Sequence, residues 1–175
     1  RGSKNHTDIL KLSVWFFNPR GIVVGFFCRS VLILLSTISG AIPSFATDSS
    51  AKKIVIPHRG ASGYLPEHTL AAAAMAHTMG ADFIEQDVVL TKDDQAIVLH
   101  DIHLETVTNV AKVFPHNARP DGRYYAIDFT LAEIKTLQVN ERINPKTGVA
   151  VYAQRFPVGW SHFEIPTLEE EIMLI

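Results

Sequence analysis

Three short apolar runs, each followed by polar side chains, dominate the hydrophobic pattern in the middle of the chain. They span Ile54–Ile56, Phe83–Leu90 and Ala96–Leu99. Each run is rich in β-branched or aliphatic residues and is bounded by Pro57 or by a polar turn at 92–95, which is typical of strands.

An alanine-rich segment, Thr69–Met79, predicts a helix between the first two strands. Thr69 is able to cap its start, and Gly80 is able to supply the left-handed residue at its end. Strand, helix and strand within about 35 residues form a βαβ unit, whose usual handedness places Ile54–Ile56 and Phe83–Leu90 side by side and parallel. The polar residues after these strands then meet at the carboxyl edge of the sheet, where α/β folds build their sites.

The C-terminal half alternates irregular stretches with capped helices. Proline and glycine make 102–129 and 138–166 irregular. Thr130 and Thr167 are each followed three residues later by glutamate, which is the capping-box pattern. The first box predicts a helix to about Leu137, and the second predicts a helix that continues to the end of the chain.

Residues 1–46 differ from the rest of the chain. Basic residues up to Arg29 precede the apolar run Ser30–Ile38, and the small-x-small sequence Ser44–Ala46 follows. This order predicts a leader with a secretory signal peptide, and hence a periplasmic or secreted protein without stable membrane insertion after cleavage. The run is short for a spanning helix, which needs about 20 apolar residues. An uncleaved anchor and a buried helix are the alternatives.

Composition and charge exclude several classes of protein. With 175 residues, 47% hydrophobic residues and a net charge of −2, the chain suits one folded domain and lacks the basic surface of a nucleic-acid-binding protein. The single cysteine, Cys28, excludes an internal disulfide framework and a cysteine-rich zinc site.

Glu85 and Asp87 lie two positions apart on a predicted strand, so their side chains share one face. Two like charges placed together favour a hard cation between them, such as Ca²⁺ or Mg²⁺, which takes carboxylate oxygens. A solvent-facing pair, or partners for Arg59, is the alternative explanation.

The other two strands also end in residues that carry chemistry. Arg59 presents a planar set of donors suited to phosphate, and Gly60 lets the backbone approach a ligand closely. His58 precedes them, and His100, beside Asp101, is placed for proton transfer near neutral pH. A surface or hydrogen-bonded core position would explain each residue taken alone.

Glu67 and His68 belong to the loop that follows the first strand. Glu67 is a candidate for binding a substrate hydroxyl or for supporting the site indirectly. His68 is a weaker candidate, noted only for its closeness to this loop.

Taken together, His58-Arg59, Glu85-Gln86-Asp87 and His100-Asp101 resemble the HR…ExD…HD pattern of the glycerophosphodiester phosphodiesterases. Residues 58–70 (HRGASGYLPEHTL) resemble the first loop of the bacterial periplasmic members, and residues 121–131 (DGRYYAIDFTL) resemble part of their insertion. The resemblance runs from about Lys52 to the C-terminus.

This resemblance implies a TIM-type (β/α)₈ barrel, of which 47–175 would be the N-terminal part, including an insertion at about 102–165. It also implies hydrolysis of glycerophosphodiesters to glycerol 3-phosphate and an alcohol. Ca²⁺ is the implied cofactor, with Mg²⁺ as the second choice.

Residue by residue, the resemblance implies that Glu85 and Asp87 are metal ligands and that His58 and His100 are the acid–base pair. It implies that Arg59 binds the phosphate. Which histidine is the acid, and whether water or the glycerol hydroxyl attacks, stay open.

The chain departs from the family pattern in one respect. The family's third metal carboxylate lies in a Glu-x-Lys context on a later strand, and Glu169–Glu171, in the capped helix, are poor substitutes. Because a whole barrel needs about 250 residues, we expect this chain alone to be weakly stable and nearly inactive, although its parent is an enzyme. A phospholipase D-like enzyme acting on lysolipids and a non-catalytic surface binding protein with the same fold are the alternatives.

Overall fold

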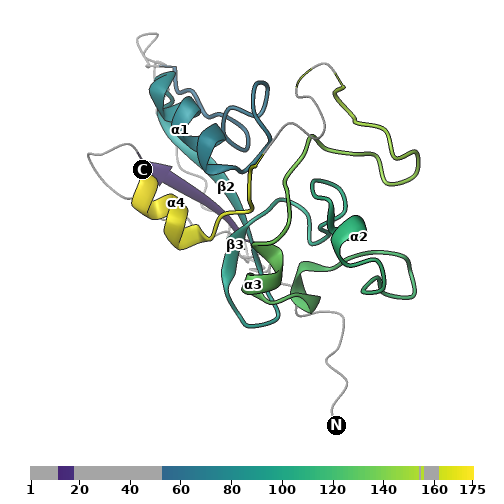
Figure 1. Cartoon of the computed structure of the whole chain (residues 1–175). Coiled ribbons are helices and arrows are strands. Elements are labelled where there is room, and N and C mark those ends of the chain that lie inside the picture. The colour runs from purple at the N-terminus through teal and green to yellow at the C-terminus, as the bar shows by residue number, and fades with distance from the viewer. Residues whose placement is uncertain (1–11, 18–52, 154, 156–161) are drawn as a thin grey trace, which may run out of the picture.

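The structure, a computed structural model, describes residues 12–17, 53–153, 155 and 162–175 (Figure 1). Within these ranges a sheet of three antiparallel strands has the order β1-β2-β3. The elements in chain order are β1 (Leu12–Phe17), α1 (Leu70–Thr78), β2 (Phe83–Leu90), β3 (Ala96–Val98), α2 (Val110–Val113), the 3₁₀ helix η1 (Ala126–Asp128), α3 (Leu131–Ile134) and α4 (Leu168–Leu174).

The hairpin formed by β2 and β3 confirms the predictions for the second and third apolar runs. Val88 pairs with Val98 and Leu90 with Ala96, and the turn between the strands places Asp94 at φ 59°. Every residue of β2 except its first and last is buried. The hairpin therefore carries its polar residues inside the molecule.

The predicted parallel pairing of Ile54–Ile56 with β2 is wrong. These residues form no strand, and Ile54 and Val55 are 59% and 57% exposed. Val55 is joined to Asp82, the residue just before β2: its carbonyl oxygen accepts a hydrogen bond from the Asp82 amide at 3.0 Å, and its amide donates to Asp82 Oδ2 at 2.9 Å. The physical reason is that β1 already occupies this edge of β2, with antiparallel pairing that runs from Leu12–Val88 to Phe17–Phe83.

The N-terminal region is described only in part. Strand β1 lies within 1–46, the predicted leader, whereas the signal-like segments Ser30–Ile38 and Ser44–Ala46 lie outside the described residues. Among the residues that are described, no helix combines the length and the apolar character needed to cross a membrane.

Helix α1 agrees with its prediction at both ends. The Thr69 hydroxyl accepts a hydrogen bond from the Ala72 amide at 3.2 Å, and Gly80 adopts φ +84° just beyond the helix. The buried face consists of small side chains, among them Ala73 and Ala76, which pack with Ile84 of β2. Small residues on this face let the helix lie close to neighbouring backbone.

Both predicted capping boxes are present. Thr130 with Glu133 opens α3, and Thr167 with Glu170 opens α4. Helix α3 ends at Ile134, three residues before the predicted end. Two short helical turns, α2 and η1, interrupt the stretch predicted to be irregular.

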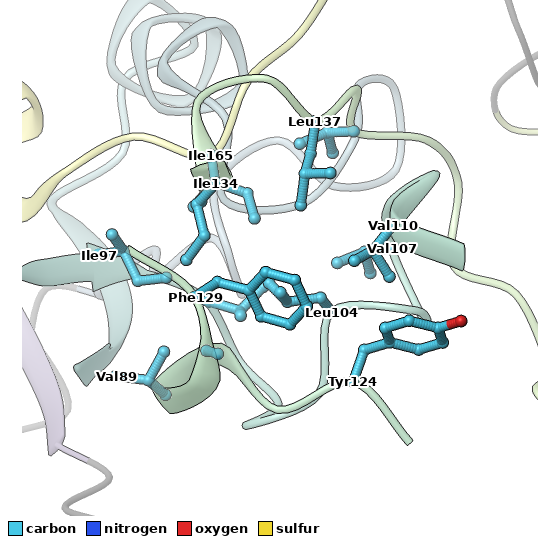
Figure 2. Packing of buried hydrophobic residues seen from close by; sticks show 13 residues of the cluster. Val89, Ile97, Leu104, Val107, Val110, Tyr124, Phe129, Ile134, Leu137 and Ile165 are labelled. Carbon is cyan, nitrogen blue, oxygen red and sulfur yellow. The ribbon is translucent and has the colours of Figure 1, made fainter. Parts of the chain in front are cut away.

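The larger hydrophobic core lies between the hairpin and the segment that follows it (Figure 2). Phe129 lies in the middle of this core with 0% exposure, and its ring centroid is 5.4 Å from that of Phe114. The core consists of residues from both sides: Val89, Ile97, Leu99, Leu104, Val107, Val110, Tyr124, Ala126, Phe129, Ile134, Leu137, Val139 and Ile165. Residues of the predicted insertion thus pack directly on β2 and β3. His100 and Asp101 lie in the chain between β3 and this insertion, so the packing fixes their position.

Candidate functional site

A cluster of possible metal ligands forms on β2 and the loop before α1. Glu85 and Asp87 are 8% and 4% exposed. One ligand atom from each of them and one from His68 all lie within 4.8 Å of one another. This geometry confirms that the two carboxylates share a face, and it adds an imidazole nitrogen to the predicted set. Two carboxylates and one imidazole are a reasonable partial donor set for a divalent cation.

Hydrogen bonds fix both sides of this cluster. His68 Nε2 lies 3.1 Å from Asp87 Oδ2, and His68 Nδ1 lies 3.2 Å from Gln86 Oε1. On the other side, the Arg59 amide donates to Glu85 Oε2 at 2.8 Å. The loop that carries His58 and Arg59 is therefore docked on one of the proposed metal ligands.

Gly60 has a different use from the one expected. Arg59 and Gly60 both adopt left-handed backbone, with φ 62° and 76°. A Cβ atom on Gly60 would lie 2.9 Å from the carbonyl carbon of Ala72, and the Ala61 amide donates to the Ala72 carbonyl at 3.0 Å. The glycine is thus required for close contact with helix α1.

A chain of ion pairs joins Arg59 to His100. Arg59 Nη1 donates to Glu67 Oε1 at 3.0 Å, and Arg142 Nε donates to Glu67 Oε2 at 3.0 Å. Arg142 also donates to Asp101. Asp101 Oδ1 lies 2.7 Å from His100 Nδ1. Residues that the sequence predicts separately are therefore connected through Arg142, which the sequence analysis does not single out.

Charge within this network stabilises the ionised forms. Burial raises the pKa of Asp101, but hydrogen bonding and charge from Arg142, together with His100, outweigh it and hold that pKa well below its usual range. The pKa of Glu67 is lowered in the same way: burial raises it, but Arg142 and Arg59 outweigh burial. Since Asp101 is ionised and accepts only, His100 Nδ1 is the donor in this pair.

A cavity of about 290 Å³ opens beside the network. Its lining is strongly polar and includes three arginines: His58, Arg59, Ser62, Glu67, Glu141, Arg142, Tyr152 and Arg155. Arg155 stacks on the Tyr152 ring at 3.8 Å. An arginine-rich cavity next to possible cation ligands suits a small anion such as a phosphate ester.

We expect Arg142→Met to lower the free energy of unfolding by about 1–3 kcal/mol at neutral pH, because it leaves Glu67 and Asp101 with fewer partners. The folded-state pKa of each acid is lowered, so their contribution is present above the ordinary carboxyl pKa and is lost on acidification. Urea denaturation at neutral and at acidic pH measures both effects.

Arg155→Met is the matched control, because Arg155 lines the same cavity but is exposed. We expect Arg155→Met to change the free energy of unfolding by no more than about 0.5 kcal/mol. An equal loss of stability in both variants would contradict a special role for Arg142.

The structure thus brings the sequence-predicted residues into one neighbourhood. Glu85 and Asp87 lie at the cation cluster, while His58, Arg59 and Glu67 line the cavity. His100 reaches them through Asp101. His58 is exposed and accepts a hydrogen bond from Arg59 Nε at 3.3 Å. His68 belongs to the cluster of possible metal ligands, and its place beside Glu67 in the loop is a sequence signal for this role. No local sequence pattern marks Arg142.

Two carboxylates and an imidazole thus gather within 4.8 Å, and the Arg59 amide joins them to the loop that lines an arginine-rich cavity. The model of the glycerophosphoryl diester phosphodiesterase family matches residues 58–175, and the chain belongs to this family.

Relatives and solved structures agree with this membership. The chain is 51% identical over 131 residues to the glycerophosphodiester phosphodiesterase of Haemophilus influenzae, a match that covers 74% of the chain and 36% of that relative. It is 39% identical over 138 residues to the enzyme of the same name from Treponema pallidum, covering 78% and 39%.

A solved structure from Silicibacter pomeroyi, also named for this activity, is 32% identical, with a TM-score of 0.55 over 69% of this chain and 39% of that one. The match confirms the prediction that the chain carries the N-terminal portion of a TIM-type barrel. The chain spans only 36–39% of the length of these relatives.

Proposed function

We propose that this chain supplies the cation- and phosphate-binding part of a site that hydrolyses glycerophosphodiesters to glycerol 3-phosphate and an alcohol. The observation that carries the proposal is the cluster of His68, Glu85 and Asp87, docked through Glu85 on the loop of Arg59. Membership of the family supports the substrate class.

The charged groups are suited to the phosphate. Arg59 and Arg142 both line the cavity, and both donate hydrogen bonds to Glu67. A cation held by Glu85 and Asp87 would supply Lewis acidity and offset negative charge on the phosphoryl oxygens. Two positioned arginines share the task of binding the phosphate anion.

The histidines are suited to proton transfer. His100 is oriented by its Nδ1 contact with Asp101, so its Nε2 is the atom that takes or gives a proton. His58, which lines the cavity, is proposed as the partner of opposite role. One histidine would take the proton from the nucleophile, and the other would give one to the leaving alkoxide.

Ca²⁺ is the cation we propose first, with Mg²⁺ second. Both are hard ions that take the carboxylate oxygens of Glu85 and Asp87. His68 adds a nitrogen donor, which suits borderline ions better. Titration with Ca²⁺, Mg²⁺ and Mn²⁺ therefore belongs in any test of the site.

The function is tested with a spliced protein, in which this chain is continued by the C-terminal part of the Haemophilus influenzae relative that follows the matched region. We expect this protein to release glycerol 3-phosphate from glycerophosphocholine and to lose the activity when a chelator is added. The chain alone is expected to be nearly inactive. A spliced protein that folds, binds cations and shows no hydrolysis would contradict the proposal.

The same assay separates the alternatives. A phospholipase D-like enzyme would prefer lysophosphatidylcholine to glycerophosphocholine. A non-catalytic binding protein would bind substrate and turn over neither. The intact set of His58, Arg59, Glu85, Asp87 and His100 argues against the non-catalytic binding protein. The periplasmic-type insertion at 102–165 argues against the phospholipase D-like enzyme.

We further propose that residues 1–46 are a leader that directs the protein to the periplasm or to secretion, so that its cleavage would also remove β1 from the edge of β2. The order of basic, apolar and small residues supports this proposal. The mass of the exported protein is expected to correspond to a chain that begins at Thr47. A mass that includes Ser30–Ile38 would instead indicate an uncleaved anchor.

A further inference from the structure

We infer that Glu141 is a specificity-determining residue, which recognises the glycerol part of the substrate by accepting hydrogen bonds from its hydroxyl groups. The inference rests on the proposed function, since it concerns the same cavity and the same substrate class. Glu141 lines the arginine-rich cavity together with Arg59 and Arg142. Neither the sequence pattern nor the chemistry proposed above gives this residue a task.

Glu67, the first candidate for binding a substrate hydroxyl, already has other partners. Its Oε1 accepts from Arg59 Nη1 at 3.0 Å, and its Oε2 accepts from Arg142 Nε at 3.0 Å. Arg142 Nη2 donates to Oε1 as well. Because guanidinium groups engage both oxygens, Glu67 is suited to positioning the two arginines. Among the described residues that line the cavity, Glu141 is the other carboxylate.

Glu141 combines burial with unused accepting capacity. The residue is 5% exposed. Within the part of the chain that the structure describes, the backbone amide of Arg142 is the group that donates to its carboxylate. Burial raises the pKa of Glu141, since little water is left to solvate the charged form. A carboxylate accepts about four hydrogen bonds, so hydroxyl groups of a ligand would fill the remaining positions.

The backbone on both sides of Glu141 is held by the inserted segment. The Asn140 amide donates to the Val107 carbonyl at 2.8 Å, and the Ile143 amide donates to the Thr106 carbonyl at 2.7 Å. Val107 belongs to the larger hydrophobic core. Since Glu141 extends from a fixed backbone, accepting from a ligand costs little further ordering of the chain.

The charges around Glu141 favour a neutral hydroxyl group over a cationic alcohol. The charge of Arg155 acts on Glu141 and lowers its pKa, and Arg59 and Arg142 line the same cavity. Three guanidinium groups attract a phosphate and repel an ammonium group such as that of choline. Glycerol offers two adjacent hydroxyl groups and no charge, so the carboxylate is able to bind it beside the phosphate.

Two phosphate esters test the inference. Glycerol 3-phosphate and propyl phosphate share the phosphate and the three-carbon chain, but propyl phosphate lacks the two hydroxyl groups. In calorimetric titrations of the 175-residue chain and of the spliced protein, both with Ca²⁺, we expect glycerol 3-phosphate to bind about 10–100-fold more tightly, the usual effect of hydrogen bonds to a charged group. Equal affinity of the wild-type proteins for the two esters overturns the inference, and so does failure of both proteins to bind either ester.

Substitutions at residue 141 locate the preference. Glu141→Met removes the acceptor, and we expect the two esters to bind this variant about equally. Deleting a negative charge strengthens phosphate binding in general, but this gain is common to both esters and cancels in the ratio of affinities. Glu141→Gln, whose amide oxygen still accepts, should retain a preference for glycerol 3-phosphate.

Glu169→Gln, exposed on α4, is the matched control and should keep the wild-type ratio. A full wild-type preference in Glu141→Met would overturn the inference, because the hydroxyl groups would then be bound by another residue.

Choline phosphate examines the other half of the substrate. We expect Glu141→Met to bind it as tightly as the wild type or more tightly, since a negative charge has been removed. Weaker binding of choline phosphate to this variant would place the cationic alcohol at Glu141 and overturn the inference.

Hydrolysis of glycerophosphocholine by the spliced protein, measured in parallel, separates the two proposals. Preference for glycerol 3-phosphate without hydrolysis contradicts the proposed function and supports the role of Glu141. Hydrolysis without the preference overturns the role of Glu141 alone.

Discussion

Replacing His100 with alanine is expected to lower kcat/KM of the spliced protein for glycerophosphocholine by about 10²–10⁴-fold, the usual contribution of a general acid or base. His100 Nδ1 donates to ionised Asp101 at 2.7 Å, and Asp101 is in turn held by Arg142. The ring is thus oriented for proton transfer at Nε2, and alanine removes the transferring atom without disturbing the buried core.

The pH profile distinguishes catalysis from structure. Loss of a general acid or base removes one limb of the dependence of kcat/KM on pH, whereas a merely destabilised protein keeps both limbs. His116→Ala, at an exposed position of the inserted segment, is the control and should keep full activity. Activity of His100→Ala near that of the wild type would remove His100 from the acid–base role.

The second large effect concerns stability and pH. Because burial raises the folded-state pKa of Glu171 from 4.5 to about 8, the folded chain holds a proton that the unfolded chain releases. Its contribution to stability is fully present below pH 4.5 and is lost as the pH rises toward 8. At about 1.4 kcal/mol per pH unit, the loss amounts to about 5 kcal/mol.

Glu171→Gln should abolish this loss, because glutamine keeps the acceptor for the hydrogen bond from Gln86 Nε2 and does not titrate. Urea denaturation at several values between pH 5 and about pH 9 measures the difference between the two chains. We expect equal stability at the acidic end and a more stable variant at the alkaline end. Stability curves that run parallel to the wild type would falsify the buried, protonated state of Glu171, and Glu169→Gln provides the reference for a change on the exposed face.

Local patterns predicted most of the elements correctly. Strand β2, helix α1 and both capping boxes depend on side chains within a few residues of one another, so the sequence reveals them. The shared face of Glu85 and Asp87 follows from the two-residue repeat of a strand.

Long-range partners were not predictable in this way. The wrong parallel pairing of Ile54–Ile56 reflects competition for the edge of β2, which β1 occupies from far away in the chain. Arg142 joins Glu67 and Asp101 across long loops, and Glu171 meets Gln86 from another element. No local spacing encodes such contacts, because they arise only when the core brings the segments together.

The missing Cβ of Gly60 has a mechanical consequence. A Cβ atom at residue 60 would lie 2.9 Å from the carbonyl carbon of Ala72, so the loop and helix α1 are in direct contact with no space for a side chain between them. The position of the loop therefore depends on the position of helix α1. A shift of Ala72 displaces the Arg59 amide and, with it, the Glu85 carboxylate that accepts a hydrogen bond from this amide. Gly60→Ala would be read out as weakened cation binding, although residue 60 touches no proposed ligand side chain.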